Sequence, residues 1–529
     1  MTVSTPYRST RPAGRDGFAE LLHAEWTKFR TVRGWVIGAI TAIVVAAGIG
    51  IFASSGGSSS CQQAGRNGPA RSGAACGPSF AIGPNSEPVS DSFYFVHQPL
   101  GADGTITARV TSLTGVAVPG VDAGPAGSAQ PSLEPWAKAG IMIKASMTSG
   151  SAYAAMLVAA DHGVRMQWNY TGDAPGLAGN VGPASPRWLR LTRSGDVITG
   201  YDSADGTHWS EVGRVTLPGL PSAAVAGLFT ASPDYISDTQ SFGGGNNGSI
   251  GPTQAQAVID QVSGMTGSWS GDYVGGDYSS GLGGYHQSGG TFTVTGSGDI
   301  APIAEGHGGP ADGAATVTDY LLGTFAGLIA LVVVAAMFMT AEYRRNLIRV
   351  TLAASPRRGR VLAAKAAVAA AVSFVAGLVG AAVAITAGGA ITRARGYYLF
   401  PVPAGTEVRV IIGTGLLAAV TAVLAVAVGT MVRRSAAAVT IVIVAIVLPY
   451  FVGVAAAVPQ SVASWLLRIT PAAGFAAQQA YPHYPQVNAI YSVLNGYFPL
   501  AWWAGLLVLC GWTAAALAGA ALLLRRRDA

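Results

Sequence analysis

Charged residues are scarce in this chain of 529 residues, where they make up only 11%. Soluble domains carry about 25% charged residues, and half of the residues here are apolar. The deficit is concentrated in particular stretches, which indicates a membrane protein and argues against an unusually apolar soluble one. The net charge of +6 comes from basic clusters beside apolar runs, so it needs no nucleic acid to explain it.

Cysteines and catalytic or nucleotide-binding motifs are also missing. Three cysteines are too few for a disulfide framework, although a Cys61–Cys76 bridge is allowed in an oxidising compartment. No phosphate loop of the form G-x-x-x-x-G-K-[ST] occurs, so the chain is not expected to bind ATP in the usual way. No cofactor or metal site is predicted, because Asp272 and Asp277 in GDYVGGDY fit a flexible loop better than a calcium site.

Six charge-free apolar runs are each about long enough to cross a bilayer, which takes roughly 20 residues. They cover residues 34–54, 320–340, 366–388, 410–430, 437–457 and 500–524. The first run has a longer charged start and a longer apolar core than a signal peptide, which predicts an uncleaved anchor. The absence of charge within the runs argues against coupling to a proton gradient.

The distribution of basic residues predicts how these spans are oriented. Segments 1–33, 341–365, 431–436 and the C-terminal arginines carry 18 Lys or Arg, whereas 55–316 carries ten basic and 19 acidic residues. By the positive-inside rule, both termini are expected in the cytoplasm and residues 55–319 outside. Lysine accounts for only four of the 32 basic residues, and alanine and glycine are abundant. This composition suggests a high-GC bacterium, and hence a multi-pass protein of a bacterial plasma membrane.

The insert between the first two spans is predicted to be rich in β-strands. In RWLRLTR, Trp188, Arg190 and Thr192 alternate with Leu189 and Leu191, which is the period of a half-buried strand. Turn signals about ten residues apart then favour an antiparallel sandwich. The predicted fold is therefore an α+β membrane protein, with a six-helix domain and an extracellular sandwich between helices 1 and 2. The predicted segments are a cytoplasmic start (1–33), a linker (55–88), the sandwich (89–300) with a glycine-rich inserted loop (234–290), a second linker (301–319) and the remaining spans (320–529) with a cytoplasmic loop (341–365).

The segments AGIMIK, GVRMQW, WLRLTRSGDVITGYDSADGTHW and AGLF resemble concanavalin-A-like jelly-roll modules. Glucanases of this fold carry paired carboxylates, and no such pair occurs here, so the insert is not predicted to be a glycosidase. Four tryptophans could stack on sugar rings of a cell-envelope glycan, although a place in the sandwich core is the favoured interpretation: Trp136, Trp168, Trp188 and Trp209.

Two further segments suggest contacts at the cytoplasmic side. FAELLHAEWTKF places Phe18, Leu22, Trp26 and Phe29 on one helical stripe, which predicts an interfacial helix before the first span. Residues 339–360, MTAEYRRNLIRVTLAASPRRGR, interleave apolar and basic residues before a Ser-Pro break, which indicates a short amphipathic helix. A loop that only fixes membrane orientation and contacts lipid would not need this pattern.

Together, AEWTKFRTVRG, EYRRNLIRVTLAASPRRGR and TPAAGFAAQQ (470–479) resemble the exporter class of ABC-transporter permeases. The resemblance implies that the loop after the second span docks on a separate nucleotide-binding ATPase subunit. It also implies pairing with a second permease, either an identical copy or a paralogue. Glu342, Arg344, Arg345 and Arg349 would supply polar contacts to the ATPase. The resemblance assigns the apolar side chains of the loop, Tyr343, Leu347 and Ile348, to the groove of that subunit.

An alternative interpretation from another class is a membrane-anchored carbohydrate-binding or adhesion protein whose helices only tether and oligomerise. Six spans exceed what a tether requires, and a tether has no use for an amphipathic segment between two spans. The permease interpretation is therefore the leading one, whereas the substrate is not indicated by the residues that line the runs.

Overall fold

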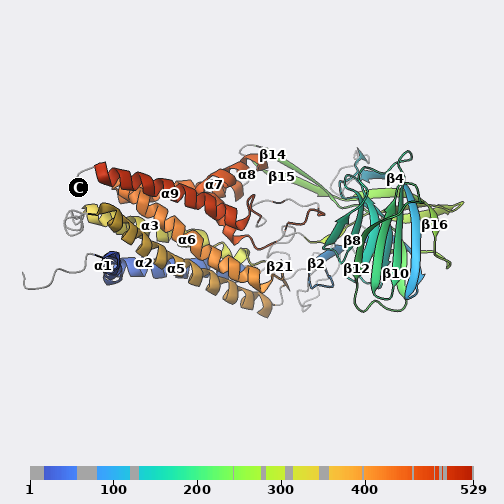
Figure 1. Ribbon diagram of the computed structural model, residues 1–529, viewed down its shortest axis with the longest axis horizontal. Helices are drawn as coiled ribbons and strands as arrows, with labels where there is room; N and C mark the ends of the chain where they lie inside the picture. The colour runs from blue at the N-terminus through green and yellow to red at the C-terminus, as the bar shows by residue number, and fades with distance from the viewer. Residues whose placement is uncertain are drawn as a thin grey trace, which may run out of the picture. The chain divides into compact units, whose positions relative to one another are not determined.

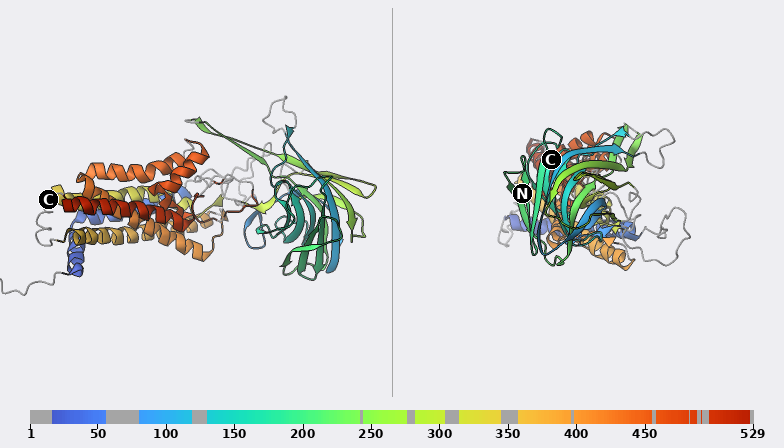
Figure 2. Two further views of the ribbon diagram at one scale, coloured as in Figure 1. Left: turned by 45° about the horizontal axis from the view of Figure 1, so that its top comes forward. Right: turned by 90° about the vertical axis from the view of Figure 1, so that its right-hand side faces the viewer.

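The computed structural model of the protein describes residues 17–55, 80–118, 130–241, 244–275, 282–303, 314–344, 357–395, 398–454, 458–481, 483–487, 491 and 497–526. These residues form an α+β protein with two compact units, a helical unit and a β unit, drawn in Figures 1 and 2. The helical unit comprises residues 1–76, 309–481 and 492–529, and the β unit comprises residues 77–308 and 482–491.

Among the described residues of the helical unit, six helices are long and apolar enough to cross a membrane, in agreement with the six predicted runs. They are α2 (Arg33–Ser55), α3 (Thr324–Arg344), α5 (Arg358–Ala394), α6 (Ala404–Val432), α7 (Ser435–Val454) and α9 (Trp502–Arg526). The third helix differs most from its prediction, because it already begins at Arg358. The alanine-rich sequence after Arg358 has a high helix propensity, and Lys365 therefore lies inside α5 and not in a loop.

The helices α3 and α6 form the centre of this unit, and most of their side chains are buried. Small residues let neighbouring helices approach, as is usual for membrane helices. At Gly323, just before α3, a Cβ atom would lie 2.0 Å from the carbonyl oxygen of Ala46 in α2, so only glycine fits there. By contrast, α2, α7 and α9 keep most of their apolar side chains on the surface of the unit, as expected of helices that face lipid or another apolar partner.

The short helix α1 (Phe18–Thr31) precedes α2 and is separated from it by the extended residue Val32. Figure 2 shows that α1 runs across the end of the helical bundle, at a steep angle to α2. Its apolar stripe is divided between two environments. Leu22 and Phe29 pack against the bundle core, whereas Phe18 and Trp26 are each 43% exposed. A helix with this division can lie in a membrane interface while it holds the bundle.

Between α7 and α9, the chain forms α8 (Gln460–Ile469) and the 3-10 helix η4 (Pro471–Gln478), whose eight residues are all buried. The amide of Gln478 donates to the hydroxyl oxygens of Thr324 and Thr414, at 3.0 and 3.3 Å. These bonds hold η4, which contains most of the TPAAGFAAQQ stretch, against α3 and α6. Two smaller elements complete the unit: η3 (Asp319–Leu321), and strand β21 (Ala314–Ala315) paired in parallel with β22 (Tyr398–Leu399).

The β unit contains two large antiparallel sheets and a small one. The eight-stranded sheet has the order β12-β11-β10-β4-β16-β19-β18, with β5 beside β4, and the seven-stranded sheet has the order β17-β3-β13-β6-β7-β8-β9. A three-stranded sheet joins β1, β2 and β20, and a ribbon joins β14 and β15. The strands are β1 (Ala81–Ile82), β2 (Pro88–Asp91), β3 (Phe93–Leu100), β4 (Asp103–Ala117), β5 (Gln130–Pro131), β6 (Lys138–Lys144), β7 (Tyr153–Ala159), β8 (Gly163–Trp168), β9 (Gly172–Pro175), β10 (Arg187–Ser194), β11 (Val197–Ser203), β12 (Ser210–Thr216), β13 (Ala224–Ala231), β14 (Tyr235–Ser241), β15 (Gly244–Gly251), β16 (Thr253–Ser263), β17 (Ser270–Val274), β18 (Gly284–Ser288), β19 (Thr291–Gly296) and β20 (Ile300–Pro302).

Alternate side chains of the seven-stranded sheet enter two different cores, as the pleat requires. On β7, Met156 and Val158 pack between the two large sheets, whereas Tyr153 and Leu157 point to the other face. That other face is covered by Val89 of β2, among others, and its aromatic side chains are Phe93, Phe95, Trp136, Tyr153, Tyr170 and Phe229. Both faces of this sheet are therefore buried within the β unit, and the jelly-roll assignment itself stays a prediction.

Strand β10 confirms the alternation predicted for RWLRLTR. Leu189 and Leu191 are fully buried in the core between the large sheets, whereas Trp188, Arg190 and Thr192 are half-buried on the opposite face. The β10–β11 hairpin turns at Gly195, whose φ of 59° lies in the left-handed region that favours glycine.

The prediction of a long inserted loop at 234–290 was wrong, because this segment contains β14 to β18. Strand β16 pairs with both β4 and β19, and its Ala255, Ala257 and Ile259 are fully buried. The sequence TQAQAVIDQVS does alternate with a period of two, but alanine and glutamine have low β-propensity. The glycine-rich runs on both sides of this strand also favoured the prediction of a loop.

A second piece of chain also belongs to the β unit. The described residues 483–487 and 491 lie in sequence between η4 and α9, yet they pack with the β unit. The buried amide of Gln486 donates to the carbonyl oxygens of Tyr170 and Thr171 at 3.5 and 3.4 Å, and the Tyr491 hydroxyl donates to the carbonyl oxygen of Tyr484 at 2.7 Å. The β unit is thus built from two separate connections between helices, which the sequence pattern did not predict.

Gln486→Leu should loosen this second piece, because it removes the donor to two carbonyl oxygens. A hydrogen bond of this kind contributes about 1 kcal/mol, so deuterium uptake by peptides from 482–491 should become several-fold faster, with little change elsewhere. Gln287→Leu, on the exposed strand β18, is the matched control. Equal uptake in the two variants would show that Gln486 does not hold the segment.

Candidate functional site

Four charged side chains meet at the end of the helical unit that carries α1. Lys365 of α5 lies 2.7 Å from a carboxylate oxygen of Glu25 in α1 and 2.7 Å from one of Glu342 in α3. Lys28 of α1 completes the group, at 2.7 Å from Glu25 and 3.0 Å from Glu342. These four residues are called the charge cluster below. They join three helices that are remote in sequence.

The cluster is buried and electrically balanced. The side chain of Lys365 is 0% exposed and that of Lys28 is 39% exposed, whereas the two carboxylates are almost fully buried. Buried charges are tolerated only when they are paired and hydrogen-bonded, and two ammonium groups here face two carboxylates. Burial by itself would lower the pKa of Lys28, but the hydrogen bond to Glu25 and the charge of Glu342 outweigh it and raise the pKa of this side chain.

Aromatic rings surround the cluster and fix the corner between the helices. The ring of Phe338 in α3 lies 5.6 Å from that of Phe29 in α1 and 5.0 Å from that of Trp35 in α2, both edge to face. The ammonium of Lys365 lies 4.5 Å from the centroid of Phe338. Such pairs contribute beyond their buried area, so the start of α5, the end of α3 and the α1–α2 corner are packed as one body.

The predicted ATPase-contact residues fall into three groups. Arg345, Leu347, Ile348 and Arg349 lie outside the described residues, as does the rest of 345–356. Arg344 is exposed at the end of α3, and Tyr343 is half-buried with the guanidinium of Arg433 5.1 Å above its ring. Glu342, however, is buried in the charge cluster. Both lysines bind its carboxylate, so Glu342 ties the end of α3 to α1 and α5, and its contact with an ATPase stays a prediction.

The sequence pattern missed Glu25, Lys28 and Lys365 as site residues, although it contained a signal. All four lysines of the chain form ion pairs with carboxylates: Lys28 and Lys365 in the charge cluster, and Lys138 and Lys144 in the β unit. In a chain that otherwise uses arginine, a lysine marks a place where a compact point charge is needed. The rarity of lysine could therefore have pointed to these four positions.

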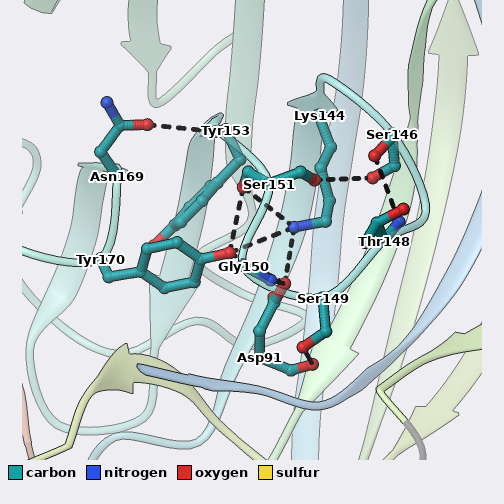
Figure 3. Close-up of polar contacts among 10 residues, drawn as sticks. All are labelled: Asp91, Lys144, Ser146, Thr148, Ser149, Gly150, Ser151, Tyr153, Asn169 and Tyr170. Carbon is teal, nitrogen blue, oxygen red and sulfur yellow. Dashed lines mark hydrogen bonds and ion pairs between the residues drawn. The ribbon is translucent and has the colours of Figure 1, made fainter. Parts of the chain in front are cut away.

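The second polar site lies inside the β unit and is shown in Figure 3. The ammonium of Lys144 on β6 lies 2.7 Å from Asp91 of β2, and the Tyr170 hydroxyl donates to the same carboxylate oxygen at 2.8 Å. The Gly150 amide donates to it as well, at 2.8 Å, which ties the loop between β6 and β7 to β2. Burial lowers the pKa of Lys144, and the carboxylate of Asp91 opposes that shift.

This second site supports the fold, because Asp91, Lys144 and Tyr170 are all buried and join β2 to β6. Lys138, at the other end of β6, pairs with Asp299 at 2.9 Å and donates to the carbonyl oxygen of Ile300 at 3.0 Å. The two lysines of β6 thus fasten the three-stranded sheet at β2 and β20. Removal of either carboxylate would leave a buried cation without its partner.

The four tryptophans considered for glycan binding lie in different environments. Trp136 is 6% exposed, stacks on His162 at 3.9 Å and belongs to the core. The other three, Trp168, Trp188 and Trp209, are half-buried. The guanidinium of Arg190 lies 3.7 Å from the ring centroid of Trp209, and that of Arg109 lies 5.6 Å from the ring centroid of Trp188, so arginines already contact these two rings.

The remaining site predictions concern cysteine and metal. Cys61, Cys76 and Asp277 lie outside the described residues. Asp272 pairs with His97 at 3.1 Å. Within the described part of the chain, no group of three or more histidine, cysteine or acidic side chains is placed to hold a metal ion.

Comparison with known proteins gives one match that spans the membrane helices. The family described as ABC-2 family transporter protein matches residues 21–529. No curated protein matches the chain.

Solved structures match parts of the chain at low similarity. A functionally unknown protein from Saccharomyces cerevisiae is 17% identical, with 33% of this chain and 76% of that chain covered and a TM-score of 0.20. Scytalido-glutamic peptidase with a transition state analog inhibitor is 10% identical, with 41% and 100% covered and a TM-score of 0.24. The GH43 BlXynB protein from Bacillus licheniformis is 13% identical, with 37% and 28% covered and a TM-score of 0.17. Scores this low carry no argument about fold or function.

Proposed function

Because the chain belongs to the ABC-2 transporter family, we propose that it is the membrane-spanning permease subunit of an ATP-driven exporter. Permeases of this family are transport components that work with a partner ATPase subunit and are not themselves enzymes. We further propose that the loop 345–356 docks on that ATPase. The chain would then form half of a translocation pathway, together with a second permease that is identical or paralogous.

The charge cluster is the observation that carries this proposal. Glu342 lies in the last turn of α3, directly before the loop, and Lys365 lies in the second turn of α5, directly after it. Glu342 binds Lys28 of α1, and Lys365 binds Glu25 of α1. A push on the loop would therefore move α1, α3 and α5 together. Rigid-body motion of packed helices is an established way to switch a site between states.

The orientation proposed for the spans agrees with where the basic residues gather. Arg358 at the start of α5 donates to the carbonyl oxygen of Leu524 near the end of α9, and Arg433 after α6 contacts Tyr343 at the end of α3. Figures 1 and 2 show α9 ending at the same end of the bundle as α1. Under the positive-inside rule this end is cytoplasmic, which would place the loop where a bacterial ATPase subunit can reach it.

The double substitution Arg345→Glu and Arg349→Glu tests the docking proposal. Charge reversal at an interface is strongly unfavourable, so stimulation of the ATPase by the permease in nanodiscs should fall by about tenfold or more. The permease should keep its unfolding temperature, since the charge cluster and the described helix core are formed by other residues. Arg214→Glu on the exposed strand β12 is the matched control. Full stimulation by the double variant would refute the assignment of these arginines.

For the β unit we propose a role as a spacer or binding module on the outer side of the membrane. The outer face of the seven-stranded sheet is filled by its own aromatic core, so a glycan groove there would have to displace core side chains. Trp188 on β10 and Trp209, directly before β12, remain as the surface for a cell-envelope glycan. A glycan array probed with the purified protein and with Trp209→Ala tests this: binding lost in the variant supports a lectin role, and absent binding supports a spacer.

A further inference from the structure

A cleft of about 830 Å³ lies between α3 and the corner of α1 and α2, beside the charge cluster. Its volume falls within the range typical of small-molecule sites, about 300–1,000 Å³. Its lining changes in character along its length. One end is polar and is formed by Lys28, Thr31, Glu342 and Arg344, whereas the walls beyond it are formed by apolar residues such as Trp35, Val333 and Met337.

The polar end of the cleft favours an anion. The two lysines and two carboxylates of the charge cluster balance one another, so the exposed guanidinium of Arg344 gives this end a net positive charge. The first turn of α2 adds the positive end of a helix dipole at Arg33 and Gly34. Gly34 leaves its approach open, because no heavy atom lies within 4 Å of the place a Cβ would take.

The same end also offers an acceptor that has no donor. The oxygen Oε2 of Glu342 is buried and accepts no hydrogen bond within the described residues. A buried acceptor without a partner is costly, so a ligand that brings a hydroxyl group would satisfy it. The anion that fits this end therefore carries both a negative charge and a hydroxyl donor.

The apolar walls indicate what is attached to that anion. They belong to α2 and α3, two helices with the length and composition of membrane spans. Met337, which lines the cleft, is 41% exposed. Hydrocarbon chains would cover such surfaces, and a head group at the polar end would then sit at the level where the spans begin.

We propose that this cleft binds an anionic phospholipid whose head group carries hydroxyl groups, such as phosphatidylglycerol. The phosphate lies between Lys28, Arg344 and the start of α2, a head-group hydroxyl donates to Glu342, and an acyl chain lies between α2 and α3. In this position the lipid contacts the corner between α1 and α2, next to the charge cluster. This inference requires only a multi-pass membrane protein, so it stands independently of the proposed ATPase contact.

Native mass spectrometry of the purified full-length protein, released from detergent, tests the site. The protein is titrated with phosphatidylglycerol and with phosphatidylcholine that has the same acyl chains. Gly34→Leu fills the open approach, and Gly48→Leu is the matched control, because Gly48 lies on the same helix and also faces open space but does not line the cleft. Both changes favour the helix, so both variants are expected to fold.

The wild type and the control variant Gly48→Leu are both expected to retain phosphatidylglycerol in preference to phosphatidylcholine. Gly34→Leu should bind phosphatidylglycerol about tenfold more weakly, and Arg344→Gln should lose about as much because it removes a charge-assisted hydrogen bond. Binding of phosphatidylcholine should be weaker than that of phosphatidylglycerol in the wild type and unaffected by Arg344→Gln.

Any of four results would overturn the proposal. Equal retention of the two lipids, or equal loss in the Gly34 and Gly48 variants, would show that the cleft does not recognise a head group. Binding of inorganic phosphate that phosphatidylglycerol does not displace would make the site one for a free anion. Loss of a dimeric mass in Gly34→Leu without any change in lipid retention would make the cleft an interface with a second copy of the chain.

Discussion

Replacement of Lys365 by methionine should lower the free energy of unfolding of the helical unit by about 3–5 kcal/mol, the usual cost of breaking a buried ion pair. The reason is local: Lys365 is fully buried and neutralises part of the charge of both Glu25 and Glu342. Without it, two buried carboxylates face only the half-exposed Lys28. The loss can be measured as an earlier thermal transition of the full-length protein in detergent.

Lys28→Met provides the matched control for this prediction. Lys28 binds the same two carboxylates but is 39% exposed, and water can compensate for its loss, so its removal should cost only about 1 kcal/mol. A triple variant with Lys365→Met, Glu25→Gln and Glu342→Gln removes the charges altogether and should regain much of the stability, since neutral replacements of buried ion pairs are often tolerated. Equal transitions for Lys365→Met and Lys28→Met would contradict the structural role assigned to Lys365.

Asp91→Ala should destabilise the β unit by a similar amount, about 3–5 kcal/mol. The substitution leaves the buried ammonium of Lys144 with only the Ser151 carbonyl oxygen and the Tyr170 hydroxyl as hydrogen-bond partners, and it removes the acceptor of the Gly150 amide (Figure 3). Hydrogen–deuterium exchange of the full-length protein measures the effect, as faster uptake by peptides that cover β2, β6 and the loop between β6 and β7.

Asp260→Ala is the control for the β unit, because Asp260 pairs with Arg109 at a partly exposed position on the eight-stranded sheet. Water can replace the lost partner there, so the cost should be about 1 kcal/mol or less. The pair of substitutions Asp91→Leu and Lys144→Met should restore slow exchange compared with Asp91→Ala alone. If Asp91→Ala exchanged no faster than Asp260→Ala, the Asp91–Lys144 pair would not be what holds the small sheet in place.

The features that the sequence predicted well are those set by local pattern. Apolar runs without charge located the six candidate spans found among the described residues, since length and composition alone decide whether a helix can cross a bilayer. Alternation located β10, because Leu189 and Leu191 differ so clearly from Arg190 and Thr192. In β16 the alternating residues are mostly alanine and glutamine, and this pattern was too weak to distinguish a strand from a glycine-rich loop.

The features that the sequence did not predict depend on contacts between distant segments. Glu25 and Lys365 are 340 positions apart, and the sequence placed them in separate segments, a predicted interfacial helix and the end of a predicted cytoplasmic loop. Only the packing of α1 against α5 shows that they meet. The same holds for Gln486, whose place in the β unit depends on carbonyl groups of Tyr170 and Thr171 that no sequence pattern marks.

The measurement that tests the central claim most directly is affinity purification of the tagged protein from its native membrane in mild detergent, followed by identification of the chains that accompany it. We predict a stoichiometric ATPase subunit that is retained by the wild type and by Arg214→Glu, and that is lost from the Arg345→Glu, Arg349→Glu variant. Recovery of the protein without an ATPase, or with cell-envelope components alone, would contradict the permease account and would favour an anchored carbohydrate-binding protein instead.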